Sequence, residues 1–233
     1  MDPEYRDRAM FVAETLVLAD LHFGKAEAST VELPIGAGAD CVERLTALLD
    51  HFDPAEVVLA GDVFHSFSYM PDSADEALSG VARAVRDAGA RLVVVEGNHD
   101  TMLGAAYASD LHDEYAFETD SGERVVVTHG HEEPERTADS FIIGHDHPAI
   151  EIEGQKRPCF LAGDGAYRRS DVFVVPPFNR LVEGLSVNGR LDGSRPELSP
   201  LVTAVGQFRP VVYDDETNET LTFPPLSQFS RML

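Results

Sequence analysis

The stretch Leu59-Ala60-Gly61-Asp62-Val63-Phe64-His65 decides the fold, because an apolar run over residues 57–60 leads directly to a carboxylate. An aspartate at the carboxyl end of a buried strand lies where α/β proteins place their binding sites and their chemistry. Gly61 has no side chain, so it leaves room for another part of the chain to approach closely. The stretch therefore predicts a buried strand with a polar site at its end.

Four further stretches repeat this arrangement of an apolar run followed by Asp, Asn or His. The polar stretches are Asp20-Leu21-His22, Gly97-Asn98-His99-Asp100, His129-Gly130-His131 and Gly144-His145-Asp146-His147. Each one alone is weak evidence, because Asp and His after a strand also serve as turn residues or helix caps. Five such stretches in one chain predict that a single sheet edge gathers them.

The first half of the chain alternates predicted strands and helices. Apolar runs predict strands over residues 11–19, 56–60 and 91–95. Helical spacing of apolar side chains predicts one helix over residues 40–52, capped by Asp40, and a second from Pro71 to about residue 88. This alternation is typical of right-handed βαβ units, which form a parallel sheet.

Helical patterns become scarce beyond residue 107, and short runs suited to strands take their place. We expect these strands to form a meander that packs on the first half. The predicted class is therefore α/β, a four-layer sandwich of two mixed sheets flanked by helices, in a single domain over residues 1–233. The predicted strands cover residues 115–118, 124–128, 140–143, 149–152, 159–162, 172–175, 201–205, 209–213 and 219–223.

The composition is strongly acidic. The chain of 233 residues carries 41 acidic and 18 basic side chains, a net charge of −23, and its only lysines are Lys25 and Lys156. The acidic residues are spread along the chain, which resembles proteins of salt-loving archaea, where concentrated salt screens the repulsion between them. The same acidity opposes tight binding of nucleic acid, because proteins that bind it usually carry basic stripes.

Nothing in the sequence predicts export or membrane insertion. No segment approaches the roughly 20 apolar residues that a membrane span needs, and the start lacks a basic region followed by an apolar one. Cys41 and Cys159 show no metal-binding spacing and are predicted to be buried free thiols. We therefore expect a cytoplasmic protein without a membrane partner.

Taken in order, the polar stretches resemble the signature of the calcineurin-like metallophosphoesterases. The matching motifs are Asp20-x-His22, Gly61-Asp62-x-x-His65, Gly97-Asn98-His99-Asp100, His129 and Gly144-His145-x-His147. Residues 19–25, 61–65 and the stretch Pro176-Pro177-Phe178-Asn179 further resemble archaeal phosphoesterases related to SbcD-type nucleases. The resemblance implies the metallophosphoesterase fold and two divalent metal ions, with manganese preferred over iron or zinc.

The resemblance also implies a role for each matching residue. One metal would be held by Asp20, His22, Asp62 and His147, and the other by Asp62, Asn98, His129 and His145, so that Asp62 is shared. A water activated between the metals would attack the phosphorus of a phosphate ester. His99 would face the substrate and give a proton to the leaving oxygen, and Asp100 would orient it.

The implied activity is hydrolysis of phosphate esters, above all phosphodiesters, with nucleic acid among the candidate substrates. Two alternatives stay open: a phosphomonoesterase, and a metal-bearing interaction scaffold without catalysis. A scaffold would be expected to lose ligands or the histidine at position 99, and all are present here. The sequence leaves the roles of His65, His131, Lys25, Arg168 and Arg169 open.

Overall fold

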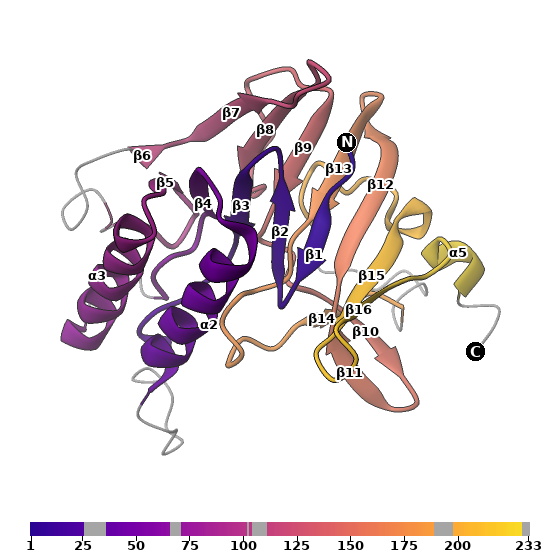
Figure 1. The fold of residues 1–233 in the computed structure, drawn as a ribbon. Coiled ribbons are helices and arrows are strands. Elements are labelled where there is room, and N and C mark those ends of the chain that lie inside the picture. The colour runs from indigo at the N-terminus through magenta and orange to yellow at the C-terminus, as the bar shows by residue number, and fades with distance from the viewer. Residues whose placement is uncertain (26–35, 66–70, 102, 104–110, 189–197, 230–233) are drawn as a thin grey trace.

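The computed structural model describes residues 1–25, 36–65, 71–101, 103, 111–188 and 198–229, and it arranges them around two large sheets (Figure 1). The first sheet has six strands in sequence order, of which β3 to β6 are parallel to one another. These strands are β1 (Glu4–Arg6), β2 (Ala9–Val12), β3 (Thr15–Leu18), β4 (Glu56–Ala60), β5 (Arg91–Val95) and β6 (Leu111–His112).

The second sheet has seven strands in the order β16-β15-β12-β13-β9-β8-β7. It is mixed rather than a pure meander, because β8, β9 and β13 are parallel neighbours. Its strands are β7 (Glu114–Glu118), β8 (Arg124–Thr128), β9 (Ser140–Ile143), β12 (Phe160–Tyr167), β13 (Ser170–Val174), β15 (Arg209–Asp214) and β16 (Glu219–Thr222). A small third sheet joins β10 (Pro148–Ile152) to β11 (Gln155–Pro158) and β14 (Leu185–Ser186).

In the described part of the chain, the long helices cover one outer face of the pair of large sheets. Helices α2 (Ala37–Phe52) and α3 (Asp72–Asp87) pack on the first sheet (Figure 1). The outer face of the second sheet packs against the small sheet and two short turns, η1 (Val205–Gln207) and α5 (Leu226–Phe229). The predicted α/β class with two mixed sheets is confirmed, and the fourth layer consists of strands and short helical turns.

Burial on both faces explains the continuous apolar runs of the central strands. In β4, Val58 and Ala60 pack toward the second sheet, while Val57 and Leu59 pack toward the helices. Alternate side chains of a strand point to opposite faces, so a strand between two apolar layers needs apolar residues at every position. The five runs that precede the polar stretches are therefore the strands at the centre of the sandwich.

Several predicted boundaries differ from the structure. The predicted strand over residues 11–19 is a hairpin of β2 and β3, because Ala13 and Glu14 adopt φ values of 47° and 57° and reverse the chain. Helix α2 begins at Ala37, so Asp40 lies in its first turn rather than at its cap. Residues 201–205 form turns instead of a strand, and residues 189–197 lie outside the described part of the chain.

The helix between β4 and β5 was located closely, since α3 starts after Pro71 and the chain leaves it at Gly89 with a φ of 81°. Cys41 and Cys159 are buried free thiols, as predicted. Among the described residues, no helix combines the length and the apolar character that a membrane crossing needs.

Candidate metal centre

The predicted ligands all lie at the carboxyl ends of parallel strands from the two large sheets. Asp20 and His22 follow β3, Asp62 follows β4, Asn98 follows β5, His129 follows β8, and His145 and His147 follow β9. Because β3, β4 and β5 are neighbours in one sheet and β8 and β9 in the other, these ends meet where the sheets face each other. The structure brings all seven predicted ligands together.

The backbone at this edge is strained. A left-handed conformation is unfavourable for residues with a side chain, and it persists only where the surrounding structure enforces it. Hydrogen bonds enforce it here: the Asp20 and His22 amides donate to the carbonyls of Gly61 (3.1 Å) and Asp62 (2.9 Å). Five of the seven predicted ligands have positive φ angles: Asp20 (54°), His22 (43°), Asp62 (50°), His145 (66°) and His147 (45°).

Two glycines allow the ligands to approach one another. A Cβ atom on Gly61 would overlap the ring of His129, and one on Gly97 would overlap the backbone nitrogen and Oδ1 of Asp62. The absence of a side chain at these two positions is what lets β4, β5 and β8 present their polar residues to one point. The close approach at Gly61 agrees with the prediction from the sequence.

One set of ligand atoms surrounds the Nε2 atom of His147. This nitrogen lies 3.2 Å from Asp20 Oδ1 and 3.3 Å from His22 Nε2. His22 Nε2 also lies 3.6 Å from Asp62 Oδ2. Asp20, His22 and His147 can therefore offer their atoms to one cation, with an oxygen of Asp62 beside them.

A second set surrounds the Nε2 atom of His129. This nitrogen lies 3.1 Å from Asn98 Oδ1, 3.3 Å from His145 Nδ1 and 3.4 Å from Asp62 Oδ1. The other ring nitrogen, Nδ1, lies 3.0 Å from the Ala60 carbonyl and donates to it, so the Nε2 lone pair faces the set. The two oxygens of Asp62 thus face the two sets, one each.

These spacings fit divalent metals. Ligand atoms about 2.1 Å from a metal lie about 3.0 Å apart in octahedral geometry and about 3.4 Å apart in tetrahedral geometry. The contacts around His147 Nε2 and His129 Nε2 span 3.1 to 3.4 Å. Asp20, His22, Asp62 and His129 are buried, with Asp20 and His129 0% exposed, whereas Asn98, His145 and His147 are half-buried on the solvent side.

The electrostatics of the centre also favour a cation. Burial lowers the pKa of His22 to about 3 and that of His145 to about 4, so both rings are neutral and keep lone pairs available. Burial opposes ionisation of Asp20, but its contacts with His147, His129 and His22 outweigh this and lower its pKa. Burial opposes the charged form of His147, but Asp20 outweighs it and raises the pKa of this ring, and burial raises the pKa of Asp62. A metal would replace the protons that these two groups attract, and carboxylate with imidazole is a donor set for manganese, iron or zinc.

His99 lies at the rim of the centre and is 26% exposed, with its Nε2 atom 3.9 Å from Asp62 Oδ2. Its Nδ1 atom lies 3.0 Å from the His65 carbonyl, to which it donates. The structure also groups His99 with His22 and Asp62 as side chains close enough to share a cation. His99 therefore faces the metal centre from the solvent side.

Asp100, which the sequence predicts to orient His99, binds three backbone amides through its carboxylate. It accepts hydrogen bonds from Val63 (3.2 Å), Phe64 (3.0 Å) and Gly97 (2.9 Å). Burial raises the pKa of Asp100 to about 6 even though these amides favour the charged form. Asp100 thus joins the loop after β5, which carries His99, to the loop after β4.

The remaining basic residues divide between the centre and the surface. The His65 ring stacks on that of His99, and the His131 ring lies 5.3 Å from that of His129. Burial lowers the pKa of His65, and the positive charge of Lys25 lowers it further. Lys25 therefore lies near His65, at the edge of the centre. Arg168 pairs with Glu133 at 2.9 Å. No described contact joins Arg168 or Arg169 to the predicted ligands.

A groove of about 850 Å³ opens beside the centre. Its lining includes Asn98 and His131, and Arg136 is the one arginine or lysine among the described residues that line it. The carboxylates on its wall belong to Glu96, Asp113, Glu114, Glu132, Glu133 and Glu135, with Asp100 at its inner end. The groove is therefore strongly negative.

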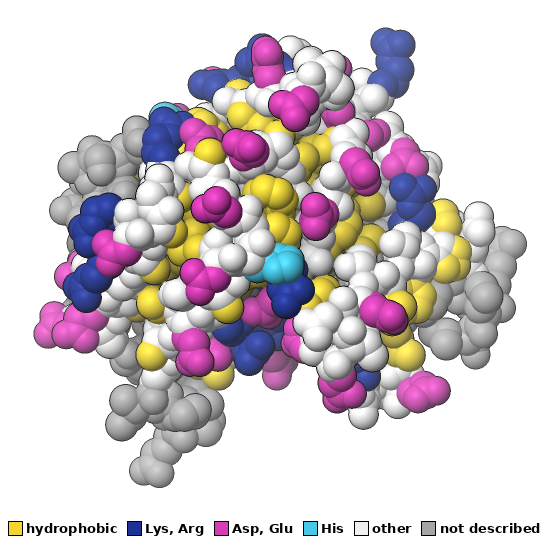
Figure 2. All heavy atoms as spheres, in the orientation of Figure 1, with side chains coloured by type: hydrophobic (Ala, Val, Ile, Leu, Met, Phe, Trp, Pro, Cys, Tyr) yellow, Lys and Arg dark blue, Asp and Glu magenta, His cyan; other side chains and the backbone are white. Residues whose placement is uncertain are grey.

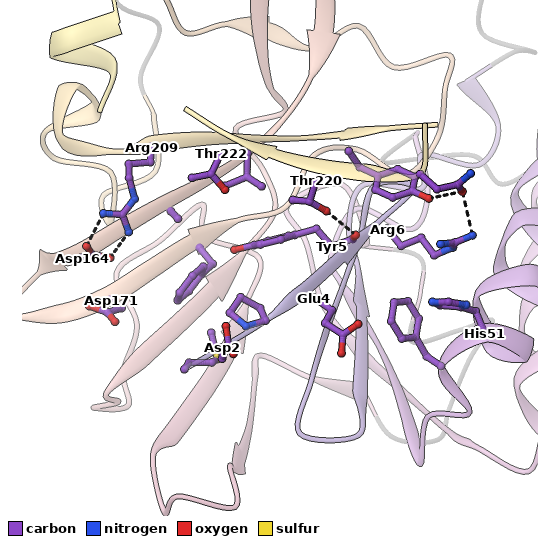
Figure 3. Close-up of a pocket in the computed structure, with 18 residues that line it drawn as sticks. Asp2, Glu4, Tyr5, Arg6, His51, Asp164, Asp171, Arg209, Thr220 and Thr222 are labelled. Atoms are coloured by element: carbon purple, nitrogen blue, oxygen red, sulfur yellow. Dashed lines mark hydrogen bonds and ion pairs between the residues drawn. The ribbon is translucent and has the colours of Figure 1, made fainter. Parts of the chain in front are cut away.

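A second cavity, of about 610 Å³, lies between β1 and the β15–β16 hairpin (Figure 3). Thr220 donates to the Tyr5 carbonyl across it, and Arg209 pairs with Asp164 at 2.8 Å (Figure 3). None of the seven predicted ligands is among the described residues that line it. This cavity is separate from the metal centre.

Two buried polar residues at the centre were given no role from the sequence. Asp146, between His145 and His147, accepts the Ser199 amide at 2.8 Å, and burial raises its pKa to about 7. Asn179 donates to the carbonyl of Leu21 at 2.7 Å. Leu21 is the residue between the predicted ligands Asp20 and His22. Asn179 belongs to the Pro-Pro-Phe-Asn stretch. In the sequence this stretch supported only the family resemblance, and nothing in it predicted a contact with Leu21.

A family model described as calcineurin-like phosphoesterase matches residues 14–201. Comparison with curated proteins gives no significant match.

Among solved structures, the nuclease MPE of Pseudomonas putida superposes with a TM-score of 0.61 at 21% identity, covering 91% of this chain and 96% of that chain. A phosphoesterase from E. coli superposes with a TM-score of 0.45 at 14% identity, covering 91% of this chain and 98% of that chain. A dimetal phosphatase from Danio rerio gives a TM-score of 0.41 at 10% identity with the same coverage.

Proposed function

The chain belongs to the calcineurin-like phosphoesterase family, and from this premise we propose that it hydrolyses phosphodiesters with two divalent metal ions, manganese first among them. The observation that carries the proposal is the division of seven ligands into two sets around His147 and His129. The carboxylate of Asp62 supports a shared ligand, because Oδ2 lies 3.6 Å from His22 Nε2 and Oδ1 lies 3.4 Å from His129 Nε2.

The protein's own residues would hold and orient the reacting groups. Asp20, His22 and His147 would hold one metal, and Asn98, His129 and His145 would hold the other, with Asp62 common to both. Two metals bound there would supply an activated water and would withdraw charge from the phosphoryl oxygens. The hydrogen bond from His129 Nδ1 to the Ala60 carbonyl keeps the ring in the tautomer whose Nε2 binds metal.

His99 would serve as the group that protonates or stabilises the leaving oxygen. Its ring is anchored at Nδ1 by the His65 carbonyl, which leaves Nε2 directed toward the space beside Asp62. Positioned proton transfer of this kind typically accelerates a reaction by about 10² to 10⁴. Asp100 supports this role indirectly, because it ties the loop that carries His99 to residues 63–64.

Charge supports a diester rather than a monoester. A phosphodiester carries a single negative charge, whereas a monoester carries up to two near neutral pH. The groove beside Asn98 presents carboxylates on its wall with one arginine among its described residues. The additional charge of a monoester would be repelled more strongly there.

Nucleic acid is a second candidate substrate, because the P. putida protein of the same fold is described as a nuclease. The acidic groove opposes a long polyanion. A polynucleotide would therefore be held by the metals and not by lysines, and short single strands would be preferred over duplex.

The test is a substrate comparison with the purified protein and manganese. We expect hydrolysis of bis-p-nitrophenyl phosphate to exceed hydrolysis of p-nitrophenyl phosphate, and chelation to abolish both. A single-stranded oligonucleotide, assayed at the same salt concentration, examines the second candidate. Faster turnover of the monoester would overturn the diester assignment, and the absence of metal-dependent turnover on all three would overturn the activity.

A further inference from the structure

We propose that Asn179 is a positioning residue, which fixes the turn carrying Asp20 and His22 and so sets the affinity for the metal that these two ligands hold. This inference rests on the proposed metal centre. It concerns a residue that lies about 160 positions away from that turn in the sequence and contacts neither ligand's side chain in the described hydrogen bonds.

Both polar atoms of the Asn179 side chain are engaged. The side chain is 3% exposed, its Nδ2 atom donates to the Leu21 carbonyl at 2.7 Å, and its Oδ1 atom accepts the Leu181 amide at 2.9 Å. The second bond fixes the orientation of the side-chain amide. If the amide were flipped, its NH2 group would face the N–H of Leu181, and both are donors. Asn179 therefore presents a donor to one carbonyl of the turn.

That carbonyl belongs to the peptide unit that joins Leu21 to His22. The same planar unit is held at its other side, where the His22 amide donates to the Asp62 carbonyl at 2.9 Å. His22 has a φ of 43° and Asp20 a φ of 54°, so both ligands sit in a conformation that non-glycine residues leave when they can. The two hydrogen bonds prevent rotation of the peptide unit and hold His22 in place.

Asn179 is itself held firmly by the surrounding backbone contacts. The Phe178 amide donates to the Ala19 carbonyl at 2.8 Å, which ties residues 176–181 to the end of β3. Arg44 donates to the Phe178 carbonyl at 2.8 Å, and Arg8 donates to the Asn179 carbonyl at 3.2 Å. Arg44 is buried, and a two-bond pair with Asp7 at 2.6 and 2.8 Å balances its charge. The donor to Leu21 is thus anchored independently of the metal centre.

Loss of the donor would leave a buried carbonyl without its partner, because Leu21 is 0% exposed. Rotation of the peptide unit would relieve this, and it would move the His22 ring away from Asp20 and His147. Removal of a hydrogen bond that supports a metal ligand typically weakens metal affinity by about 10- to 100-fold. The set around His129 has its own support from Ala60 and should not change.

The experiment is a manganese titration of the full-length, metal-free protein by calorimetry, with wild type, Asn179→Ala and Asn179→Asp. The aspartate variant keeps the volume and the acceptor for Leu181, but it cannot donate to Leu21 when ionised. We expect one of the two manganese equivalents to weaken by about 10- to 100-fold in both variants, and the other to stay within about threefold of wild type.

Asn188→Ala is the matched control, since Asn188 Nδ2 donates to the Glu151 carbonyl at the same 2.7 Å, away from the centre. It should bind both equivalents like wild type. Wild-type affinity for both equivalents in Asn179→Asp would overturn the inference, and so would equal losses in Asn179→Ala and Asn188→Ala. Failure of the wild type to bind two equivalents would instead overturn the proposed metal centre.

Discussion

His99 is close to the metal ligands without belonging to the two sets around His147 and His129. We predict that His99→Ala keeps both metals and loses about 10² to 10⁴ in rate on a diester with a poor leaving group, because a positioned proton donor contributes about that factor. With p-nitrophenolate, which needs little protonation to leave, the loss should be smaller. Turnover on the two substrates and the metal content of the variant provide the measurement.

The control for this substitution is His51→Ala, because His51 lies at the end of α2 outside the centre. It should retain the wild-type rate and metal content. His99 lies close enough to His22 and Asp62 to share a cation with them, so coordination by His99 is the alternative to test. If His99→Ala lost a metal ion, His99 would be a ligand, and full activity on both substrates would make it structural.

Each oxygen of the Asp62 carboxylate faces one of the two ligand sets. Asp20 also lies near the second set, where its Oδ1 atom is 4.0 Å from His129 Nδ1. We predict that Asp62→Ala loses both metals or retains one of them weakly, whereas Asp20→Ala mainly weakens the set around His147. The physical reason is that each Asp62 oxygen faces a different set, while Asp20 Oδ1 is nearest His147 Nε2, at 3.2 Å. Elemental analysis after gel filtration measures the stoichiometry, and two retained ions in Asp62→Ala would contradict the shared ligand.

At the scale of the elements, the centre depends on how closely the loops after β4 and β5 approach each other. We predict that Gly97→Ala abolishes the binding of at least one metal, because the new methyl group would overlap the backbone nitrogen and Oδ1 of Asp62. The shared carboxylate would have to move, and both ligand sets would change with it. Metal content and the rate on bis-p-nitrophenyl phosphate are the readouts.

Gly206→Ala is the control for this element, because a methyl group there would meet its nearest neighbour, Ser227 Cβ, at an ordinary 3.4 Å. We expect it to bind metal and to unfold like wild type. Unchanged metal binding in Gly97→Ala would show that the loops after β4 and β5 can separate without loss of the centre.

At the scale of the whole molecule, the acidic side chains are spread over the visible face and do not gather in one patch (Figure 2). We predict that the midpoint of thermal unfolding rises between 0.1 M and 3 M potassium chloride, because the net charge of −23 repels itself and salt screens it. The screening length falls from about 10 Å at 0.1 M to about 3 Å at 1 M. Circular dichroism melts measure the shift.

Sucrose separates screening from a general solvent effect, because excluded cosolutes also stabilise compact states without screening charge. Sucrose alone should raise the midpoint less than salt does. A melt that is unchanged between 0.1 M and 3 M salt would contradict adaptation to concentrated salt.

Most of the central strands could be located from the sequence, because each is buried on both faces and carries an uninterrupted apolar run. β5, β8 and β9 have the predicted bounds for this reason. The β2–β3 hairpin was missed, because its turn at Ala13 and Glu14 uses neither glycine, proline nor asparagine. The elements that cover the outer face of the second sheet could not be predicted either. Short turns such as η1 and α5 have too few residues to show a helical period.

Which residues meet can be read from the chain alone, since polar residues after five buried parallel strands have to gather at the carboxyl edge of the sheets. How they meet depends on folding: which nitrogen of each imidazole faces the centre, how the two oxygens of Asp62 are divided, and that Asp100 and Asn179 bind the backbone. Strand ends are set by local apolar patterns that can be read along the chain. Hydrogen bonds such as that from Asn179 to Leu21 join residues that only folding brings together, and no local pattern encodes them.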